Sequence, residues 1–165
     1  MSVARAVGPK IAYICADPGV PVFGRKGSSI HVQEVVRALT RSGAQVELFA
    51  MRFDGEPSPD LGHIPRHQLP PVGKGDVAQR EQAALGVNDA LYRALAAAGP
   101  FDFVYERYSL WSYAGMEFAA ATKIPGLLEV NAPLIEEQAQ HRSLVNRAGA
   151  EEVARRTFGA ASALL

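Results

Sequence analysis

The sequence predicts an α/β fold of the Rossmann-like, doubly wound type, in which helices flank a parallel β-sheet. Short apolar runs of strand length alternate with longer segments of helical periodicity along the chain. The short runs are apolar almost throughout, as are strands whose two faces are both buried. The segments between the runs are long enough for the right-handed crossovers that parallel strands require.

The front of the chain carries the first such unit. Residues 10–16, KIAYICA, predict a buried strand, and residues 45–50, QVELFA, predict a second. Between them, the Pro/Gly-rich stretch DPGVPVFGRKG leads into a helix over SSIHVQEVVRALTRSG, whose apolar residues recur at near-helical spacing. Gly43 is expected to cap this helix at its C-terminus.

The middle of the chain begins with a long loop. Residues 51–75 hold five prolines and four glycines, and they predict only one short strand, at 66–69. Asp76 is expected to cap a helix that runs to about residue 98, with Gly86 as a candidate kink.

The last part of the chain alternates again between strands and helices. Strands are expected at 101–105 and 126–130, with an incipient strand at 162–165. One helix is expected over 109–122. Another is expected from Pro133 to about Gly159, capped by Asn131 or Ala132 and with a candidate break near Gly149.

The composition fits one compact domain. The 165 residues include 17 basic and 17 acidic side chains, so the formal net charge is zero. This balance argues against a nucleic-acid binder or a polybasic membrane-surface protein. Cys15 is the single cysteine, so we expect neither an internal disulfide nor a cysteine-based metal site. No apolar run is long enough to span a membrane, and the first residues lack a signal-peptide core.

The glycine-rich loop after the first strand is the first candidate site, because ligands of such sheets bind at the carboxyl ends of the strands. Its candidate residues are Gly24, Gly27, Ser28 and Ser29. Glycines allow a close approach of the backbone, and the free amides of a helix start favour a phosphate. The alternative is a flexible connection with a serine N-cap. The loop has neither the dinucleotide fingerprint nor a Walker A motif.

The segment after residue 105 is the second candidate. Arg107 suits a phosphate or carboxylate, and Tyr108 suits stacking on a sugar face. Alternatively, Glu106 and Arg107 simply pair with each other or face solvent. A carboxylate inside an apolar strand is costly unless it is paired, so we expect Glu129 to contact Arg107 on the neighbouring strand end.

The segment after the strand at 126–130 is the third candidate. Asn131 is expected as a helix N-cap or as a site residue. Glu137 and His141 are four residues apart on one helical face, followed by Arg142, and they form either a polar rim of the site or a solvated face. His63 and His67 are not expected to bind a metal, because Pro65 between them prevents a shared helical face.

These segments resemble the N-terminal half of a retaining family-4 (group 1) glycosyltransferase of the GT-B fold. The front segment KIAYICADPGVPVFGRKGSSIHVQEVVRALTRSGAQVELFA has that family's order of strand, Pro/Gly loop, helix and strand. FDFVYERYSLWSYAG resembles its fourth-strand segment. GLLEVNAPLIEEQAQHRSL resembles a subgroup pattern of Glu-x-Asn-Ala-Pro-Leu followed by Glu and an Arg–Leu pair. The resemblance extends from Lys10 to Leu165.

The resemblance implies two facing Rossmann-like domains with the active site between them. Residues 1–165 would be the acceptor-side domain, and the C-terminal nucleotide-sugar domain is absent from this chain. Gly24, Gly27 and Ser28 would reach the donor phosphates across the cleft. The histidine that many members carry just after the fifth strand is replaced by Asn131, with Glu129 two residues earlier. His31, on the first helix, is not expected to replace it, and no catalytic residue is assigned.

The implied activity is the transfer of a sugar, of the hexosyl type, from a nucleoside-diphosphate sugar with retention of configuration. No metal and no cofactor are expected, because loop amides and cations would stabilise the leaving diphosphate. The expected partners are the nucleotide sugar, a sugar, lipid or small-molecule acceptor, and the chain's own C-terminal domain, without nucleic acid. The expected location is the cytoplasm or the inner membrane face.

A different class of function remains open from the sequence. The chain would then be a complete, flavodoxin-like module that binds a ligand or regulates a partner. A nucleotide-sugar epimerase or an NAD enzyme is disfavoured, because the dinucleotide fingerprint is missing.

Overall fold

The computed structural model describes residues 7–165 and contains one six-stranded sheet in which every pair of neighbours is parallel. The strand order is β3-β2-β1-β4-β5-β6, so the sheet grows outward from β1 in both directions. The strands are β1 (Lys10–Cys15), β2 (Gln45–Ala50), β3 (Arg66–Gln68), β4 (Phe103–Arg107), β5 (Gly126–Glu129) and β6 (Ala163–Leu164). The predicted α/β Rossmann-like, doubly wound sheet is confirmed.

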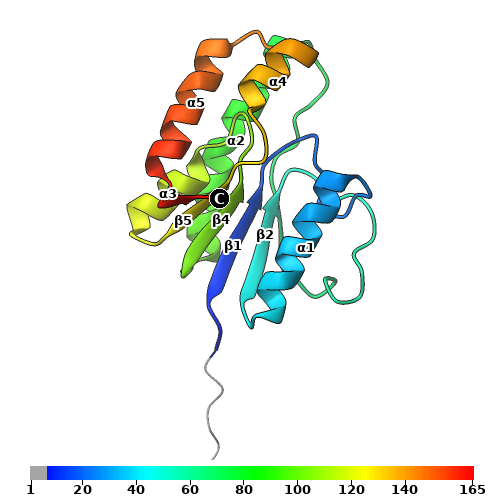
Figure 1. Ribbon diagram of the computed structural model, residues 1–165, viewed down its shortest axis with the longest axis vertical. Coiled ribbons are helices and arrows are strands. Elements are labelled where there is room, and N and C mark those ends of the chain that lie inside the picture. Colours follow the sequence, from blue (N-terminus) through cyan, green and yellow to red (C-terminus); the bar gives the residue numbers. More distant parts are fainter. Residues whose placement is uncertain (1–6) are drawn as a thin grey trace, which may run out of the picture.

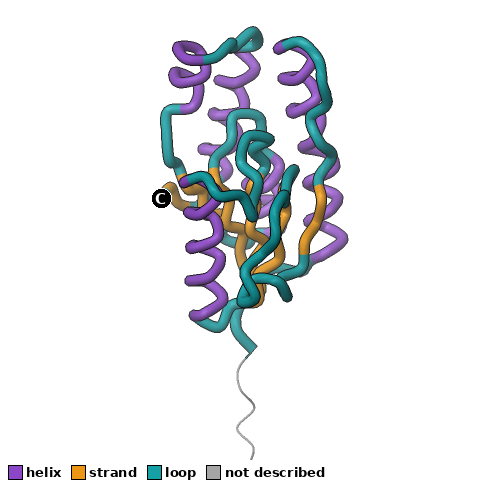
Figure 2. The backbone as a smooth tube through the Cα atoms, turned by 90° about the vertical axis from the view of Figure 1, so that its right-hand side faces the viewer, coloured by secondary structure: helices purple, strands orange, loops and turns teal. Residues whose placement is uncertain are grey.

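Five helices flank this sheet: α1 (Gly27–Arg41), α2 (Val77–Ala98), α3 (Ala114–Thr122), α4 (Leu134–His141) and α5 (Arg147–Ala160). Figure 1 shows α1 on one side of the sheet, to the right of β1 and β2, with α3 and α5 to the left of the strands and α4 above their carboxyl ends. Helix α2 packs on the same face as α3, opposite α1. Figure 2, turned by 90°, shows the strands next to one another in the middle of the molecule, with helices around them. None of the helices in the described part is long and apolar enough to cross a membrane.

The core lies in two layers, one on each face of the sheet. Alternate residues of β1 supply both: Ile11, Tyr13 and Cys15 pack toward α1, and Ala12 and Ile14 pack toward α2 and α3. All five are at most 1% exposed. A central strand that is buried on both faces explains the continuous apolar run in the sequence.

The predicted start of α2 is confirmed. The Asp76 side chain accepts a hydrogen bond from the Gln79 amide at 2.9 Å, and the Gln79 side chain accepts one from the Asp76 amide at 3.0 Å. This capping box satisfies two amides that the helix leaves free. Gly86 does not interrupt the helix, which continues to Ala98.

Two element boundaries in the second half of the chain differ from the prediction. Strand β4 begins at Phe103 and ends at Arg107, two residues later than expected, because its last two charged side chains find partners inside the fold. Helix α3 begins at Ala114 rather than at residue 109, since the Asn88 side chain accepts from the amides of Tyr113 and Ala114 and so fixes the helix start there.

The helix expected from Pro133 to Gly159 is two helices, so a break is present, but it lies at residues 142–146 rather than near Gly149. The chain leaves the helical conformation after His141, and α5 starts with Asn146 as its N-cap. The Glu81 carboxylate on α2 accepts from the amides of Val145 and Asn146 at 2.9 and 2.8 Å. This long-range contact holds the break in place.

Candidate functional site

Glu129 lies at the centre of a polar cluster at the carboxyl ends of β4 and β5. Its Oε1 lies 2.9 Å from His31 Nε2 of α1 and accepts from Asn131 Nδ2 at 2.5 Å. Its Oε2 accepts from the Tyr105 hydroxyl. Glu129 is 7% exposed, so these donors replace the water that a carboxylate loses on burial.

The predicted contact between Glu129 and Arg107 is confirmed. Arg107 Nη1 lies 3.6 Å from Glu129 Oε1, and the two residues are paired in the register of β4 and β5. The guanidinium Nε of Arg107 is buried and has no partner in the described part of the chain. Arg107 therefore brings positive charge to this edge without using all of its donors.

Two stacked tyrosines form the floor of the cluster. The ring of Tyr105 stacks on that of Tyr13 of β1, with centroids 5.2 Å apart. Burial, together with the hydrogen bond to Glu129, raises the pKa of Tyr105 well above its usual range, so the phenol stays protonated and remains a donor. The Tyr13 hydroxyl is buried without a partner among the described residues. We call this set of residues the Glu129 cluster: Tyr13, His31, Tyr105, Arg107, Glu129 and Asn131. It includes residues of β1 and β4, the neighbouring strands between which the strand order of the sheet reverses.

The first part of the glycine-rich loop before α1 is hydrogen-bonded to that helix. Gln33 Nε2 of α1 donates to the carbonyls of Val22 and Gly24 at 2.8 and 3.0 Å. A Cβ at Gly24 would lie 2.7 Å from Ser29 Oγ, so a glycine is needed there to admit the buried serine.

The start of α1 is open toward solvent. Its N-cap is Lys26, with no side-chain capping bond, so the alternative of a serine N-cap is wrong: Ser28 and Ser29 lie inside the first turn. A Cβ added at Gly27 would meet no atom within 4 Å, and Gly27 has no positive φ, so neither space nor backbone strain requires a glycine there. The uncapped amides and the helix dipole favour an anion at this point.

Other predicted site residues lie outside the Glu129 cluster. Tyr108 packs against Phe158 of α5, with ring centroids 5.0 Å apart, and is 6% exposed. Glu137 and Arg142 are exposed, on and just after α4. Asn131 does not cap α4, whose N-cap is Pro133, because its amide instead donates to Glu129.

Sequence reasoning missed three residues of this region: His31, Tyr105 and Glu106. His31 is separated from Glu129 by 98 positions, so no local pattern links them. The sequence predicts a strand end at Tyr105 and a loop at Glu106, whereas both lie inside β4. Their opposite orientations follow from the alternation of a strand, which sends Tyr105 toward α1 and Glu106 toward α3.

Glu106 is fully buried on the α3 side of the sheet. Its Oε1 accepts from the Ser112 hydroxyl at 2.5 Å, and its Oε2 has no partner among the described residues. Burial raises the pKa of Glu106 to about 7, although Ser112 and the Met116 amide favour the charged form. Gly115 makes room for it, since a Cβ there would lie 2.3 Å from Oε2.

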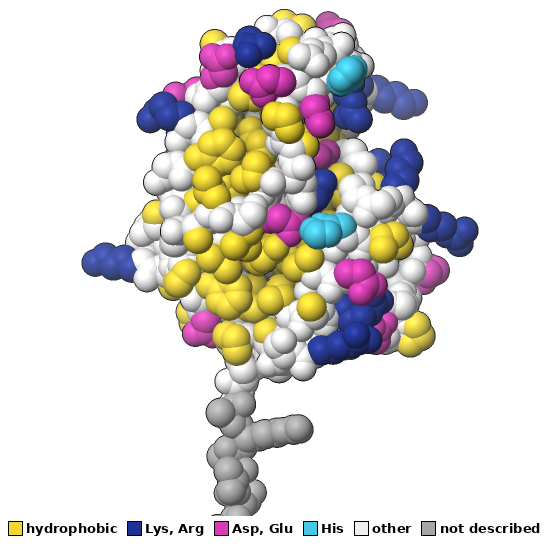
Figure 3. Space-filling view, viewed as in Figure 1, with side chains coloured by type: hydrophobic (Ala, Val, Ile, Leu, Met, Phe, Trp, Pro, Cys, Tyr) yellow, Lys and Arg dark blue, Asp and Glu magenta, His cyan; other side chains and the backbone are white. Residues whose placement is uncertain are grey.

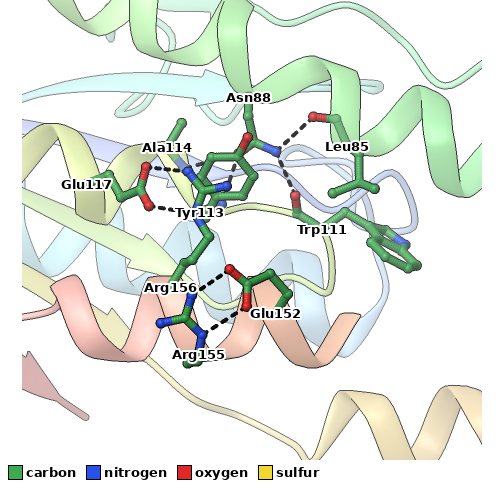
Figure 4. A network of polar contacts seen from close by, with 9 residues as sticks. All are labelled: Leu85, Asn88, Trp111, Tyr113, Ala114, Glu117, Glu152, Arg155 and Arg156. Atoms are coloured by element: carbon green, nitrogen blue, oxygen red, sulfur yellow. Dashed lines mark hydrogen bonds and ion pairs between the residues drawn. The ribbon is translucent and has the colours of Figure 1, made fainter. Parts of the chain in front are cut away.

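A second network, drawn in Figure 4, holds the loop between β4 and α3. Asn88 Nδ2 donates to the carbonyls of Leu85 and Trp111 at 2.9 and 2.8 Å. Arg156 of α5 makes a two-bond contact with Glu117 of α3, at 2.7 and 2.8 Å, and covers the Tyr113 ring. This network fixes α5 against α3. Over the described residues, no group of three or more His, Cys, Asp or Glu side chains is arranged to hold a metal ion.

Comparison of the sequence with protein-family models and with curated proteins finds no match. Among solved structures, sucrose-phosphate synthase from Thermosynechococcus elongatus is similar, with a TM-score of 0.60 and 17% identity. The alignment covers 94% of this chain and 41% of that one. A chain from Listeria monocytogenes described as a UDP-N-acetylglucosamine 2-epimerase is also similar, with a TM-score of 0.54 and 17% identity, over 96% of this chain and 38% of that one.

A third similar structure has a different description. The C-terminal domain of a hydrogenase from Pyrococcus furiosus gives a TM-score of 0.52 and 13% identity, over 78% of this chain and 98% of that domain. The likeness is one of fold. The chain spans about two fifths of the length of the synthase and of the epimerase chain.

Proposed function

We propose that this chain is the acceptor-side domain of a glycosyltransferase of the GT-B type. Together with a nucleotide-sugar domain, it would transfer a sugar from a nucleoside-diphosphate sugar with retention of configuration. The observation that carries the proposal is the placement of two features at one end of the sheet. The uncapped start of α1 and the Glu129 cluster both lie at the carboxyl edge, and His31 of α1 connects them.

The two features suit the two halves of such a substrate pair. Free amides at Gly27 and Ser28 offer hydrogen bonds to the donor diphosphate. The Glu129 carboxylate and the Asn131 amide offer an acceptor and a donor to the hydroxyls of a sugar. Arg107 contributes positive charge near the leaving group, and Gly24 and Ser29 keep the loop in shape. Glu137 and Arg142 are proposed as rim contacts only.

The likeness to the synthase and to the epimerase chain supports the fold that this proposal requires. The hydrogenase domain shows that the same fold also occurs in a protein with a different description, so the chemistry has to be tested directly.

The test follows the backbone amides of the isolated chain by NMR during titration with UDP, GDP and ADP. We expect one nucleotide to shift the amides of Gly27 and Ser28 with a dissociation constant near 1 mM, or about 4 kcal/mol. We expect no sugar transfer by this chain alone, because donor recognition needs the second domain, and transfer from a matching nucleotide sugar by the complete gene product.

Gly27→Val is the informative variant, because a branched side chain there would cover the amides. Gly159→Val is its matched control, since Gly159 is also a helical glycine with no atom within 4 Å of an added Cβ. Loss of nucleotide binding in Gly27→Val, with binding retained in Gly159→Val, would support the site. Equal nucleotide binding by the two variants would show that the loop before α1 is not part of the nucleotide site. Absence of sugar transfer by the complete gene product would refute the proposed function.

A further inference from the structure

A groove opens beside the Glu129 cluster, between the loop after β5, helix α4 and helix α5. We call it the α4–α5 groove. Its volume is about 550 Å³, within the usual range for small-molecule sites. The residues used below are Tyr108, Val130, Asn131, Leu134, Glu136 and Phe158, all of which line it. Figure 3 shows hydrophobic side chains gathered at the surface near α4 and α5.

The walls of the groove are mainly apolar. Tyr108 and Phe158 form an aromatic wall, with their rings tilted by 53°. Phe158 is 37% exposed, so part of its ring is open to a ligand. Val130 and Leu134 add aliphatic surface. An aromatic or alicyclic ring that displaced water from this wall would bury apolar surface on both partners.

The polar groups of the groove are few and lie at defined places. The Tyr108 hydroxyl makes no hydrogen bond to another described residue and is not among the fully buried polar atoms. Glu136 is the one charged side chain of the lining among the described residues, and its Oε1 lies 3.9 Å from Nη2 of Arg147 at the start of α5. Neither lysine nor arginine lines the groove within the described chain. Asn131 lines the groove while it donates to Glu129, so the groove and the cluster are continuous.

The α5 wall and the base of the groove are held in place. The contact between Arg156 and Glu117 fixes α5 against α3 (Figure 4). The Val130 amide, at the base of the groove, donates to the Leu165 carbonyl at 3.0 Å. A wall fixed in this way loses little freedom when a ligand binds.

We propose that the α4–α5 groove binds the ring-bearing, uncharged part of an amphipathic hydroxyl compound. Its ring lies on the Tyr108–Phe158 wall, and its hydroxyl end points to Asn131 and the Glu129 cluster. Resting on the proposed function, this compound is the sugar acceptor. The described lining of the groove carries the Glu136 carboxylate and no cation, so a phosphate on the part of the compound that lies in the groove would gain no opposite charge from the lining.

Two fluorescent probes of the same shape test the charge preference. At pH 7, 2-naphthol is neutral and 2-naphthyl phosphate is an anion. We expect 2-naphthol to bind the chain at least tenfold more tightly than 2-naphthyl phosphate. We also expect Glu136→Gln to strengthen binding of the phosphate at least threefold and to leave 2-naphthol unchanged. Equal affinity of the parent chain for both probes would overturn the proposal.

Substitutions in the wall locate the site. Phe158→Ala removes half of the aromatic wall and is expected to weaken 2-naphthol binding at least tenfold. Tyr108→Phe keeps the ring and removes only the hydroxyl, and it is expected to weaken binding about fivefold, the value of one hydrogen bond. Tyr92→Ala is the matched control, because Tyr92 is a 41% exposed aromatic residue on α2 that contacts Phe118 and lies outside the groove lining.

Unchanged 2-naphthol binding in Phe158→Ala, with NMR spectra that show a folded chain, would overturn the assignment. The outcome is separable from that of the proposed function. Nucleotide binding at Gly27 with sugar transfer but no probe in the groove would refute only the present inference. Probe binding in the groove without transfer from any nucleotide sugar would refute only the glycosyltransferase.

Discussion

The buried Glu106 carboxyl makes the stability of this fold depend on pH. Its pKa is raised from an ordinary 4.5 to about 7, mainly by burial. Below pH 4.5 the carboxyl is protonated in both the folded and the unfolded chain, and it costs nothing. Between pH 4.5 and 7 the unfolded chain releases the proton while the folded chain keeps it, so the free energy of unfolding falls with rising pH.

The size of this loss follows from the shift. Each pKa unit corresponds to about 1.4 kcal/mol, so the ionised carboxylate costs the folded state about 3 kcal/mol above pH 7. Glu106→Gln removes the ionisation and keeps the shape, with the amide in place of the protonated acid. We therefore expect the variant to match the parent near pH 4 and to exceed it by up to about 3 kcal/mol at pH 8.

Urea denaturation of both proteins across pH 4 to 8 measures the effect as the difference between variant and parent at each pH. Glu151→Gln is the control, because Glu151 is exposed and, among residues 7–165, its ion pair is with Arg147 on its own helix. Its difference from the parent should stay within about 0.5 kcal/mol at every pH. A Glu106→Gln difference that is the same at pH 4 and pH 8 would show that the folded chain accommodates the charge, and the reasoning would be refuted.

Three further predictions concern the packing of two glycines and one buried ion pair. Gly115→Ala is expected to destabilise the fold by about 1–3 kcal/mol, because its Cβ would meet Glu106 and Ile14, whereas Gly86→Ala on the open helix surface should stabilise it by about 0.5 kcal/mol. Urea denaturation midpoints measure both effects, and equal effects would contradict the close contact at Gly115. Gly24→Ala should also destabilise the fold by about 1–3 kcal/mol, because its Cβ would clash with Ser29 and Pro21. Gly27→Ala is the control, and an identical melting temperature for the two variants would show that the loop rearranges to accept the extra methyl group. Glu129→Ala should lower the free energy of unfolding by about 3 kcal/mol, because it leaves the Arg107 guanidinium buried without its carboxylate partner. Urea denaturation measures the loss, and a value below about 1 kcal/mol would mean that water takes the place of the carboxylate.

The parts of the fold that can be predicted from sequence are those set by local pattern. Strands β1, β2 and β5 coincide with the predicted apolar runs to within a residue at either end, because burial on both faces leaves a continuous signal. The capping box at Asp76 is equally local, since its two partners are three residues apart.

The parts that cannot be predicted depend on residues far apart in the chain. Glu106 and Arg107 indicate a loop because they are charged. They extend β4 instead, because Glu106 accepts a hydrogen bond from Ser112 and Arg107 pairs with Glu129. The break before α5 needs Glu81, which is 64 positions away from Val145. The groove between α4 and α5 follows from that break, so it too lies beyond any local pattern.

The Glu129 cluster illustrates the same division within the site. A carboxylate in an apolar strand predicts that a partner exists, and Arg107 is indeed within 3.6 Å, but three shorter contacts come from His31, Asn131 and Tyr105. These contacts differ in their access to solvent. The Tyr105 contact is buried, whereas the His31 side chain is 47% exposed. Under the proposed function, a sugar hydroxyl would replace His31 or Asn131 at Oε1 while Tyr105 keeps Oε2, so one carboxylate both stabilises the sheet edge and binds a ligand.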